Sequence, residues 1–249
     1  MQNAGVMIIS QSGASEDLVR SPNAARANGA FVCAITNVPR SAVEEAAHKT
    51  LSINPGAERA VPATKTVIGG IAAGMNLLAS LSPSYANAAE RAAQLFPTDV
   101  DLPMLDSMVS GLLRAQNIYV IGRGAGLGAA QEVALKLKEC CALHAEAYSA
   151  SEVLHGPLQL VKKPLTVLIL DTEEAATQDS LDRTEARFTQ SGSDVYRLRT
   201  SDFGVANLAP AAAAALLIYA LYPTIKNAAV ALGYNPYAPD TLAKVTVTV

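Results

Sequence analysis

Tryptophan is absent from this sequence of 249 residues, and aromatic residues make up only 5% of it. Proteins that bind single-stranded nucleic acid stack bases on aromatic side chains, so such surfaces are not expected here. A basic excess is also lacking, because 19 Lys and Arg residues stand against 22 Asp and Glu residues. Nucleic-acid-binding domains carry a basic patch or stripe. The composition therefore predicts no nucleic-acid partner.

Cysteine is scarce as well. The three cysteines are Cys33, Cys140 and Cys141, and an odd, small number gives no disulfide framework. Cys140 and Cys141 are adjacent in a predicted helix, so their side chains point in different directions and make a poor metal pair. His, Cys and Asp residues show no spacing typical of a metal site elsewhere. We expect no metal and a reducing, cytoplasmic location.

Signals for export or membrane insertion are also missing. Residues 1–5 lack the basic region with which secretory signals begin. The apolar run at 211–220 is shorter than the roughly 20 residues that span a bilayer. The sequence therefore predicts no membrane partner.

Apolar residues, in contrast, are abundant: half of the sequence is hydrophobic. Short apolar runs alternate with longer helical patterns, which is typical of an α/β fold with a parallel sheet. Strands are expected at 6–9, 31–35, 50–53, 117–121, 165–170 and 195–198. Helices are expected at 16–27, 42–48, 64–81, 87–95, 103–115, 127–143, 151–155, 174–190 and 210–232.

The second half of the chain repeats the logic of the first half. Polar and Pro residues at 96–103 interrupt the periodicity, so we predict two domains, 1–96 and 103–249. Each is expected to be a parallel sheet flanked by helices in three layers. Residues 6–9 are apolar on both faces, as in a buried central strand. Because a central strand rarely begins a domain, the first domain is expected to lack its opening strands.

Residues 10–15 (Ser-Gln-Ser-Gly-Ala-Ser) join a predicted strand to a predicted helix. Ligands bind at the carboxyl ends of parallel strands, and a helix N-terminus there suits a phosphate. Ser10, Gln11, Ser12 and Ser15 add neutral polar groups, and Gly13 permits a close approach. The alternative is a simple helix cap. Three hydroxyls beside an amide favour anion binding.

A glycine run covers residues 122–128 and resembles a dinucleotide-binding fingerprint. Its spacing is wrong, because Leu127 stands where the third glycine belongs, and no acidic residue lies near Ala142. We therefore expect no NAD and no other cofactor. A tight strand-to-helix turn and a binding role remain equally good interpretations of this run.

Other candidates are weak when taken singly. Lys136 and Glu139 are three residues apart on one helix face, which is most often a solvated ion pair. His155 precedes Gly-Pro at a predicted helix end, where a cation is favoured in any case. Lys244 is a lone charge in the C-terminal tail.

Taken together, the motifs resemble the double-SIS (sugar isomerase) family. The resemblance rests on Ser-Gln-Ser-Gly at 10–13, Pro-Ala-Thr-Lys-Thr at 62–66, Ala-Leu-Lys-Leu-Lys-Glu at 134–139, His-Ala-Glu-Ala-Tyr at 144–148, His-Gly-Pro at 155–157 and Leu-Ala-Lys-Val-Thr at 242–246. The order is similar to that of the isomerase half of glucosamine-6-phosphate synthases. It is still more similar to that of the stand-alone SIS-type glucosamine-6-phosphate deaminases.

The resemblance implies a site for a hexose 6-phosphate. The phosphate would be held by Ser10, Gln11, Ser12 and Ser15. Val61 would line the sugar pocket, and Glu139, beside Lys136, would move a proton between C1 and C2. His155 would assist ring opening in the partner subunit of a homodimer, and Lys244 would form a Schiff base.

The resemblance also implies which reaction to expect. Asp240 stands where the synthase tail carries a basic residue, which favours a deaminase over a glutamine-dependent synthase. A fragment of a glutamine–fructose-6-phosphate transaminase is the first alternative. A regulator that binds a phosphosugar without chemistry is the second, and a fragment that cannot fold is the third. A set of Glu139, His155 and Lys244 favours an enzyme, since a sensor needs no group that moves protons.

Overall fold

The structure is a computed structural model that describes residues 4–97, 99–163 and 165–244. Contacts divide the chain into two compact units: residues 1–86 with 241–249 form the first, and residues 87–240 form the second. This division lies within α4 (Pro83–Leu95). The domain limits 1–96 and 103–249 remain predictions. Val245 and Thr246 of the tail motif lie outside the described residues.

The first unit contains a parallel sheet of three strands in the order β1-β2-β3. The strands are β1 (Gly5–Ser10), β2 (Phe31–Thr36) and β3 (Lys49–Ser52), and the helices are α1 (Glu16–Ala27), α2 (Ala42–Ala46) and α3 (Lys65–Leu81). Ile8, Val32 and Ala34 of the sheet pack with Ala25 of α1 and Val43 of α2. The carboxyl ends of the strands lie at one edge, where residues 10–15 and the loop at 53–64 begin.

The expectation of a fully buried central strand at residues 6–9 is wrong in this structure. β1 pairs with β2 and lies at the edge of the described sheet. Ile8 is buried, because it faces α1 and α2, whereas Met7 and Ile9 point to the other face and are 47% and 56% exposed. The apolar residues were identified correctly, but their burial depends on partners that the sequence pattern does not specify.

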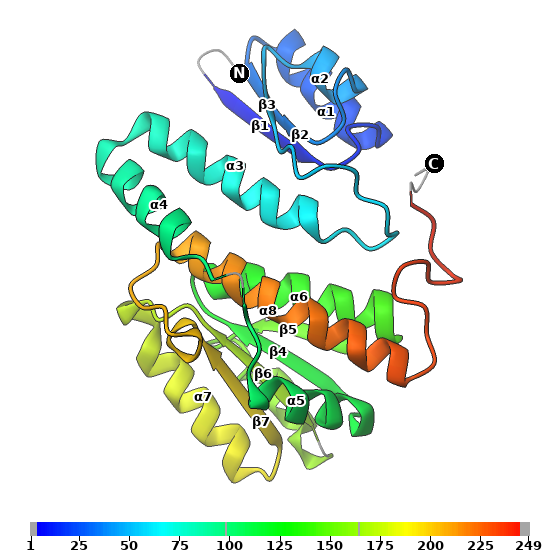
Figure 1. The fold of residues 1–249 in the computed structure, drawn as a ribbon, viewed down its shortest axis with the longest axis vertical. Helices are drawn as coiled ribbons and strands as arrows, with labels where there is room; N and C mark the ends of the chain where they lie inside the picture. The colour runs from blue at the N-terminus through cyan, green and yellow to red at the C-terminus, as the bar shows by residue number, and fades with distance from the viewer. Residues whose placement is uncertain (1–3, 98, 164, 245–249) are drawn as a thin grey trace. The chain divides into compact units, whose positions relative to one another are not determined.

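The second unit contains a parallel sheet of four strands in the order β5-β4-β6-β7. The strands are β4 (Ile118–Gly122), β5 (Ala145–Ser149), β6 (Thr166–Asp171) and β7 (Asp194–Arg199). The helices are α5 (Pro103–Arg114), α6 (Ala125–Cys141), α7 (Gln178–Gln190) and α8 (Pro210–Ala231). Figure 1 shows α7 on one face of this sheet and α6 and α8 on the other.

The core of the second unit follows from strands that are apolar on both sides. All residues of β4 and β6 are buried. Val167 and Ile169 of β6 pack in one cluster with Leu181 and Phe188 of α7. Alternate residues point to opposite faces of a sheet, so the remaining apolar side chains of β6 face α6 and its neighbours. Parallel sheets flanked by helices, as predicted, are confirmed.

The structure of the second unit differs from the sequence-based expectation at two places. Residues 145–149 form β5, an edge strand that the sequence pattern did not reveal, because three of its residues are only half-buried and no apolar run marks it. The helix expected at 151–155 is wrong. Turns occupy these residues, and a short 3₁₀ helix follows at Gly156–Lys162.

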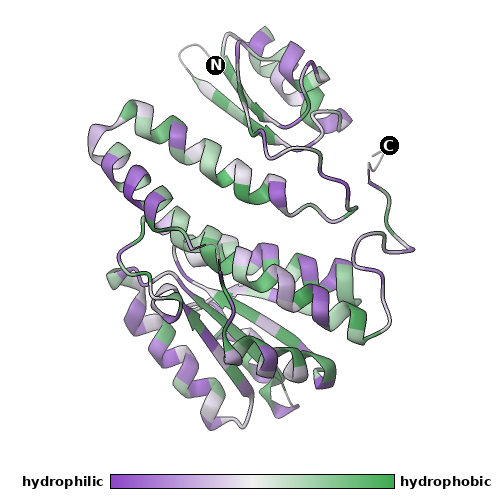
Figure 2. Cartoon of the chain, viewed as in Figure 1, coloured by the Kyte–Doolittle hydropathy of each residue, from purple (hydrophilic) through white to green (hydrophobic). Residues whose placement is uncertain are grey.

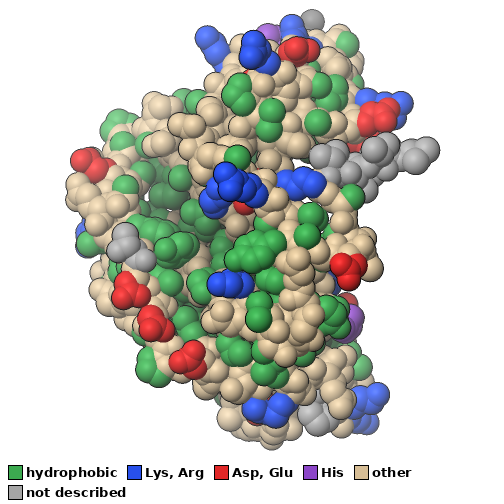
Figure 3. Space-filling model, turned by 45° about the vertical axis from the view of Figure 1, so that its right-hand side comes forward, with side chains coloured by type: hydrophobic (Ala, Val, Ile, Leu, Met, Phe, Trp, Pro, Cys, Tyr) green, Lys and Arg blue, Asp and Glu red, His purple; other side chains and the backbone are tan. Residues whose placement is uncertain are grey.

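Helix α8 contains the apolar run at 211–220. Among the described residues, it is the one helix long and apolar enough to cross a membrane, and 67% of its most apolar window is buried. It packs on α6 and α5, and Figure 2 shows hydrophobic residues along much of its length. This burial is that of a core helix. On the face in Figure 3, Lys and Arg side chains are spread among Asp and Glu rather than forming one basic patch.

Candidate active-site groups in the two units

Residues 10–15 lie between the end of β1 and the start of α1, as predicted. The Ser10 hydroxyl oxygen accepts the N–H of Gly13 at 3.0 Å, and the Ser12 hydroxyl oxygen accepts the N–H of Ala14 at 3.3 Å. Gly13 has φ +62°, and a Cβ on it would lie 2.1 Å from the hydroxyl oxygen of Ser41. Only glycine fits this turn, because both the backbone conformation and the space exclude a side chain.

The helix-cap interpretation of this loop can be tested directly. Ser15 is the N-cap residue of α1 and has extended backbone angles, but its side chain makes no capping hydrogen bond. A serine that served only as a cap would bind a free N–H of the first turn. A simple cap therefore does not account for the hydroxyl of Ser15, and the side chain of Gln11 in the same loop is half-buried.

The loop after β3 contains Val61, the predicted pocket residue, which is half-buried. Lys244 belongs to the same unit, and its ammonium group donates a hydrogen bond to the carbonyl oxygen of Ala60. The structure thus brings the predicted tail lysine next to the predicted pocket segment. Glu58, which the sequence analysis did not single out, lies in the same loop and accepts hydrogen bonds from Thr64 and Thr66.

The second unit holds Lys136 and Glu139 on α6. Their side chains form an ion pair at 2.5 Å, and Lys136 also lies 3.4 Å from a carboxylate oxygen of Glu132. The side chain of Lys136 is only 4% exposed, so the interpretation of a solvated surface pair is wrong. Burying a charge costs several kcal/mol unless it is paired, and here two carboxylates pair it.

Glu132 was missed by the sequence analysis. Its side chain is 13% exposed and accepts a hydrogen bond from the hydroxyl of Tyr222 at 2.9 Å. Burial raises the pKa of Glu132 above its ordinary value, although the charge of Lys136 opposes the rise. The available signal was spacing, because Glu132 lies four residues before Lys136 on one helix face.

The two cysteines of α6 can be excluded as nucleophiles. Burial raises the pKa of the Cys140 thiol to about 11 and that of the Cys141 thiol to about 12. The thiolate is the reactive form of cysteine, and both groups stay protonated at neutral pH.

His155 belongs to the second unit but is exposed, directly before the 3₁₀ helix at Gly156–Lys162. Within the described part of the chain, its side chain makes no hydrogen bond or ion pair with Lys136 or Glu139. The structure therefore brings Lys136 and Glu139 together on α6 and leaves the His155 imidazole available to solvent or to another molecule.

The carboxylate of Glu174 lies against the glycine-rich turn at the start of α6. Glu174 accepts the N–H of Ala125 at 3.0 Å and the hydroxyl of Thr172 at 2.9 Å. A Cβ on Gly124 would lie 2.6 Å from the same carboxylate oxygen. The start of α6 thus already holds a negative charge, which favours the tight-turn interpretation over phosphate binding.

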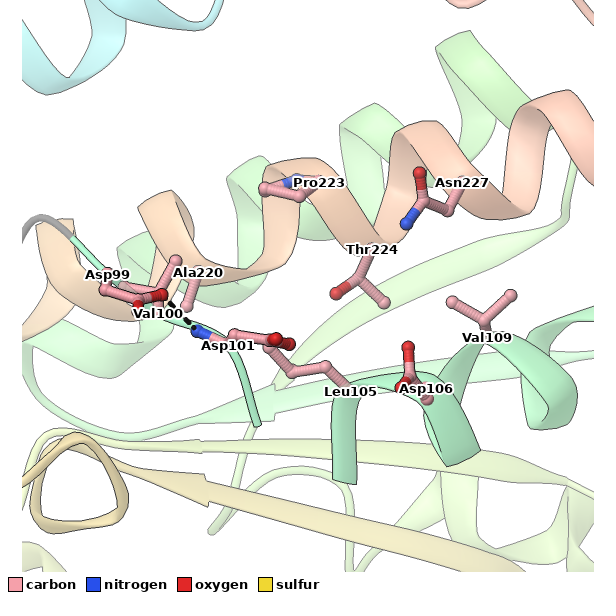
Figure 4. Close-up of a pocket in the computed structure, with 10 residues that line it drawn as sticks. All are labelled: Asp99, Val100, Asp101, Leu105, Asp106, Val109, Ala220, Pro223, Thr224 and Asn227. Atoms are coloured by element: carbon pink, nitrogen blue, oxygen red, sulfur yellow. Dashed lines mark hydrogen bonds between the residues drawn. The ribbon is translucent and has the colours of Figure 1, made fainter. Parts of the chain in front are cut away.

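A pocket of about 280 Å³ lies between α5, α8 and the segment before α5 (Figure 4). Asp99, Asp101 and Asp106 line it, and Lys136 and Glu139 do not. Carboxylates repel a phosphate, so this pocket is a poor candidate for the phosphosugar site. Among the described residues, no group of three His, Cys, Asp or Glu side chains is placed to hold a metal ion.

Comparison with known proteins places the motifs in one family. A profile of the SIS domain matches residues 2–80 and 111–188. The glutamine–fructose-6-phosphate aminotransferase (isomerizing) of Sulfurisphaera tokodaii is 33% identical over 258 residues, which cover 98% of this chain and 42% of the relative. The chain thus spans about two-fifths of the length of this curated relative.

Solved structures share the fold. The glucosamine-6-phosphate deaminase of Thermotoga maritima superposes with a TM-score of 0.78 at 20% identity, covering 100% of this chain and 77% of that one. The C-terminal domain of the glucosamine-fructose-6-phosphate aminotransferase of Francisella tularensis gives 0.71 at 20% identity, covering 96% and 74%. From the matched profile and the shared fold, this chain belongs to the SIS domain family.

Proposed function

We propose that the chain is an enzyme that interconverts aldose and ketose forms of hexose 6-phosphates, with the deamination of glucosamine 6-phosphate as its reaction. One molecule of water would be consumed, and fructose 6-phosphate and ammonia would be released. The observation that carries the proposal is Lys136, buried between the carboxylates of Glu132 and Glu139. A regulator that only binds a sugar needs no carboxylate that moves a proton, whereas isomerisation does.

Each predicted residue has a chemical role in this reaction. Glu139, held by Lys136, would carry a proton between C1 and C2, because isomerisation needs one base that serves both carbons. Lys244 would hold the open-chain sugar as an imine. Val61 would line the pocket. The phosphate would be held by Ser10, Gln11, Ser12 and Ser15.

The proposal includes a homodimer in the cytoplasm. His155 is exposed, and within the described residues its side chain forms no hydrogen bond or ion pair with Lys136 or Glu139. An imidazole in this position suits a role in the site of a partner subunit, where it would assist ring opening by proton transfer.

A fragment of a glutamine-dependent aminotransferase is the second candidate. It is favoured by the relative from Sulfurisphaera tokodaii, of which this chain covers only part. In that case the isomerase chemistry would be the same, but ammonia would enter from another source and be incorporated into the sugar.

The wild-type chain tests the proposal when it is incubated with glucosamine 6-phosphate in deuterated water. We expect fructose 6-phosphate, free ammonia and deuterium at the sugar carbon that exchanges its proton, measured by NMR. Exchange without release of ammonia would favour the aminotransferase fragment. Binding in calorimetry without any exchange would contradict the enzyme and indicate a regulator.

The phosphate is expected to be the main anchor of the substrate. Ser12→Ala should weaken binding of glucosamine 6-phosphate more than binding of glucosamine, because a hydrogen bond to a charged group contributes about 1.5–3 kcal/mol. Calorimetry with both ligands measures the difference. An equal loss for the two ligands would show that Ser12 does not contact the phosphate.

A further inference from the structure

We propose that Glu58 is a positioning residue that fixes the pocket loop and holds the tail lysine, Lys244, beside it. This inference rests on the proposed function, since it explains how the lysine that would form the imine is held in position. It does not make Glu58 a catalytic residue, because Glu58 acts through the loop and through Lys244.

Three hydrogen bonds to one carboxylate oxygen close the loop. The Oε2 atom of Glu58 accepts the N–H of Thr64 at 3.0 Å, the N–H of Thr66 at 2.9 Å and the hydroxyl of Thr66 at 3.0 Å. These N–H groups open α3, so the carboxylate also neutralises the positive end of the helix. Val61 lies between Glu58 and Thr64 in sequence, so these hydrogen bonds restrict its position.

The same loop receives Lys244 from the C-terminal tail. The ammonium group donates to the carbonyl oxygen of Ala60, two residues after Glu58. Lys65 donates to the carbonyl oxygen of Ala57 at 2.7 Å, so Glu58 lies between two carbonyls that hold cations. Residues 241–244 are exposed, and no packing against a core keeps Lys244 in place.

The charge of Glu58 is present at neutral pH. Burial by itself raises the pKa of Glu58, but the hydrogen bonds from Thr66 and Thr64 and the charge of Lys244 outweigh it, and the pKa is lowered. An ionised carboxylate attracts the ammonium form of Lys244. It also attracts the protonated imine, which has the same charge, so Glu58 complements the lysine before and after it reacts.

Imine formation between Lys244 and the sugar needs no other reactant. The neutral ε-amine of Lys244 adds to the carbonyl carbon of fructose 6-phosphate, and the carbinolamine loses water to give the imine. Borohydride, added as the trapping reagent, then reduces the carbon–nitrogen double bond to a stable secondary amine. Mass spectrometry identifies the modified lysine.

A helix cap without influence on Lys244 is the competing explanation of Glu58. The two explanations differ in their effect on two reactions of the tail lysine. If Glu58 positions Lys244, its loss should slow imine formation with the bound sugar and should speed acetylation by acetic anhydride, a small reagent that needs no alignment. A cap alone predicts a change in thermal stability and parallel changes, or none, in the two reactions.

The experiment compares the full wild-type chain with Glu58→Gln, Glu58→Asp and a charge-matched control, Glu45→Gln. Glu45 lies in α2 of the same unit and is exposed. In Glu58→Gln we expect about three- to tenfold less borohydride trapping at Lys244 and about three- to tenfold faster acetylation of Lys244, consistent with the attraction between charges near a protein surface. Glu58→Asp should recover part of both effects, and the control should match the wild type.

Two further measurements on the wild-type chain, acetylation at high ionic strength and borohydride trapping, distinguish the remaining explanations. Raising ionic strength to 1 M should bring acetylation of the wild type close to that of Glu58→Gln, because salt screens exposed charges. If wild-type Lys244 is never trapped, the imine role fails, while acetylation still tests the inference on Glu58. The inference would be overturned if Lys244 in Glu58→Gln were acetylated at the wild-type rate. It would also be overturned if the loss of trapping merely paralleled the fall in melting temperature.

Discussion

Glu139→Gln is expected to lower the rate of solvent deuterium exchange into the sugar by about 10²–10⁴-fold, the usual cost of losing a general base. The amide keeps the size of the side chain and can still accept a hydrogen bond from Lys136 through its oxygen. It cannot take up and release the proton that must pass between two sugar carbons. The exchange is measured by NMR with fructose 6-phosphate in deuterated water.

Binding provides the control for this variant. Glu139 lies in the second unit, and the predicted phosphate loop lies in the first. Affinity for fructose 6-phosphate should therefore change less than tenfold in calorimetry. Exchange at the wild-type rate in Glu139→Gln would show that another group is the base. Glu132 would then be the next residue to replace, because it contacts the same lysine.

Burial of Lys136 gives a physical reason to expect a large effect. A surface ion pair contributes at most about 1 kcal/mol and can be lost without consequence. Lys136 instead depends on two carboxylates. The side chain of Glu139 is 24% exposed, so a substrate can approach its carboxylate. The neighbouring Glu132 is less exposed. Because Glu139 is more exposed than Glu132, it is the better candidate for exchanging protons with a ligand.

The sequence predicted best what depends on local pattern. The apolar strands β4 and β6 and the long helices α6 and α8 were all expected from periodicity. The short edge strand β5 was not, because partly exposed positions of an edge strand carry no continuous apolar run. The exposure of Met7 and Ile9 on β1 was not predictable either, since burial of a strand face depends on which elements cover it.

The candidate groups show the same division. The loop at 10–15 was predictable, because its polar residues are contiguous and lie between a strand and a helix. The roles of Glu58 and Glu174 were not, because each carboxylate acts on backbone N–H groups several to many residues away in sequence. Spacing within α6 placed Lys136 beside Glu139, but it could not show that the lysine is buried.

Arg197→Leu is expected to give the largest loss of stability. The guanidinium group of Arg197 bonds Oδ2 of Asp171 at 2.7 and 3.0 Å, and the side chains are 3% and 0% exposed. Removing one partner of a buried pair costs about 3–5 kcal/mol. The buried carboxylate of Asp171 would keep only the more distant Arg199, at 3.6 Å, as a cationic partner. For a unit of this size, the melting temperature should fall by about 6–20 °C in calorimetry.

Two further variants make this expectation specific to the buried charge. Arg183→Leu removes an exposed pair with Asp179, whose side chains are 67% and 83% exposed, and should change stability by less than about 1 kcal/mol. The double variant Arg197→Leu with Asp171→Leu removes both buried charges and should recover part of the loss, because apolar replacements of buried pairs are often well tolerated. A double variant no more stable than Arg197→Leu would indicate that side-chain shape and the lost bonds of Arg197 to Asp182 and Glu185, rather than the buried charge of Asp171, determine the cost.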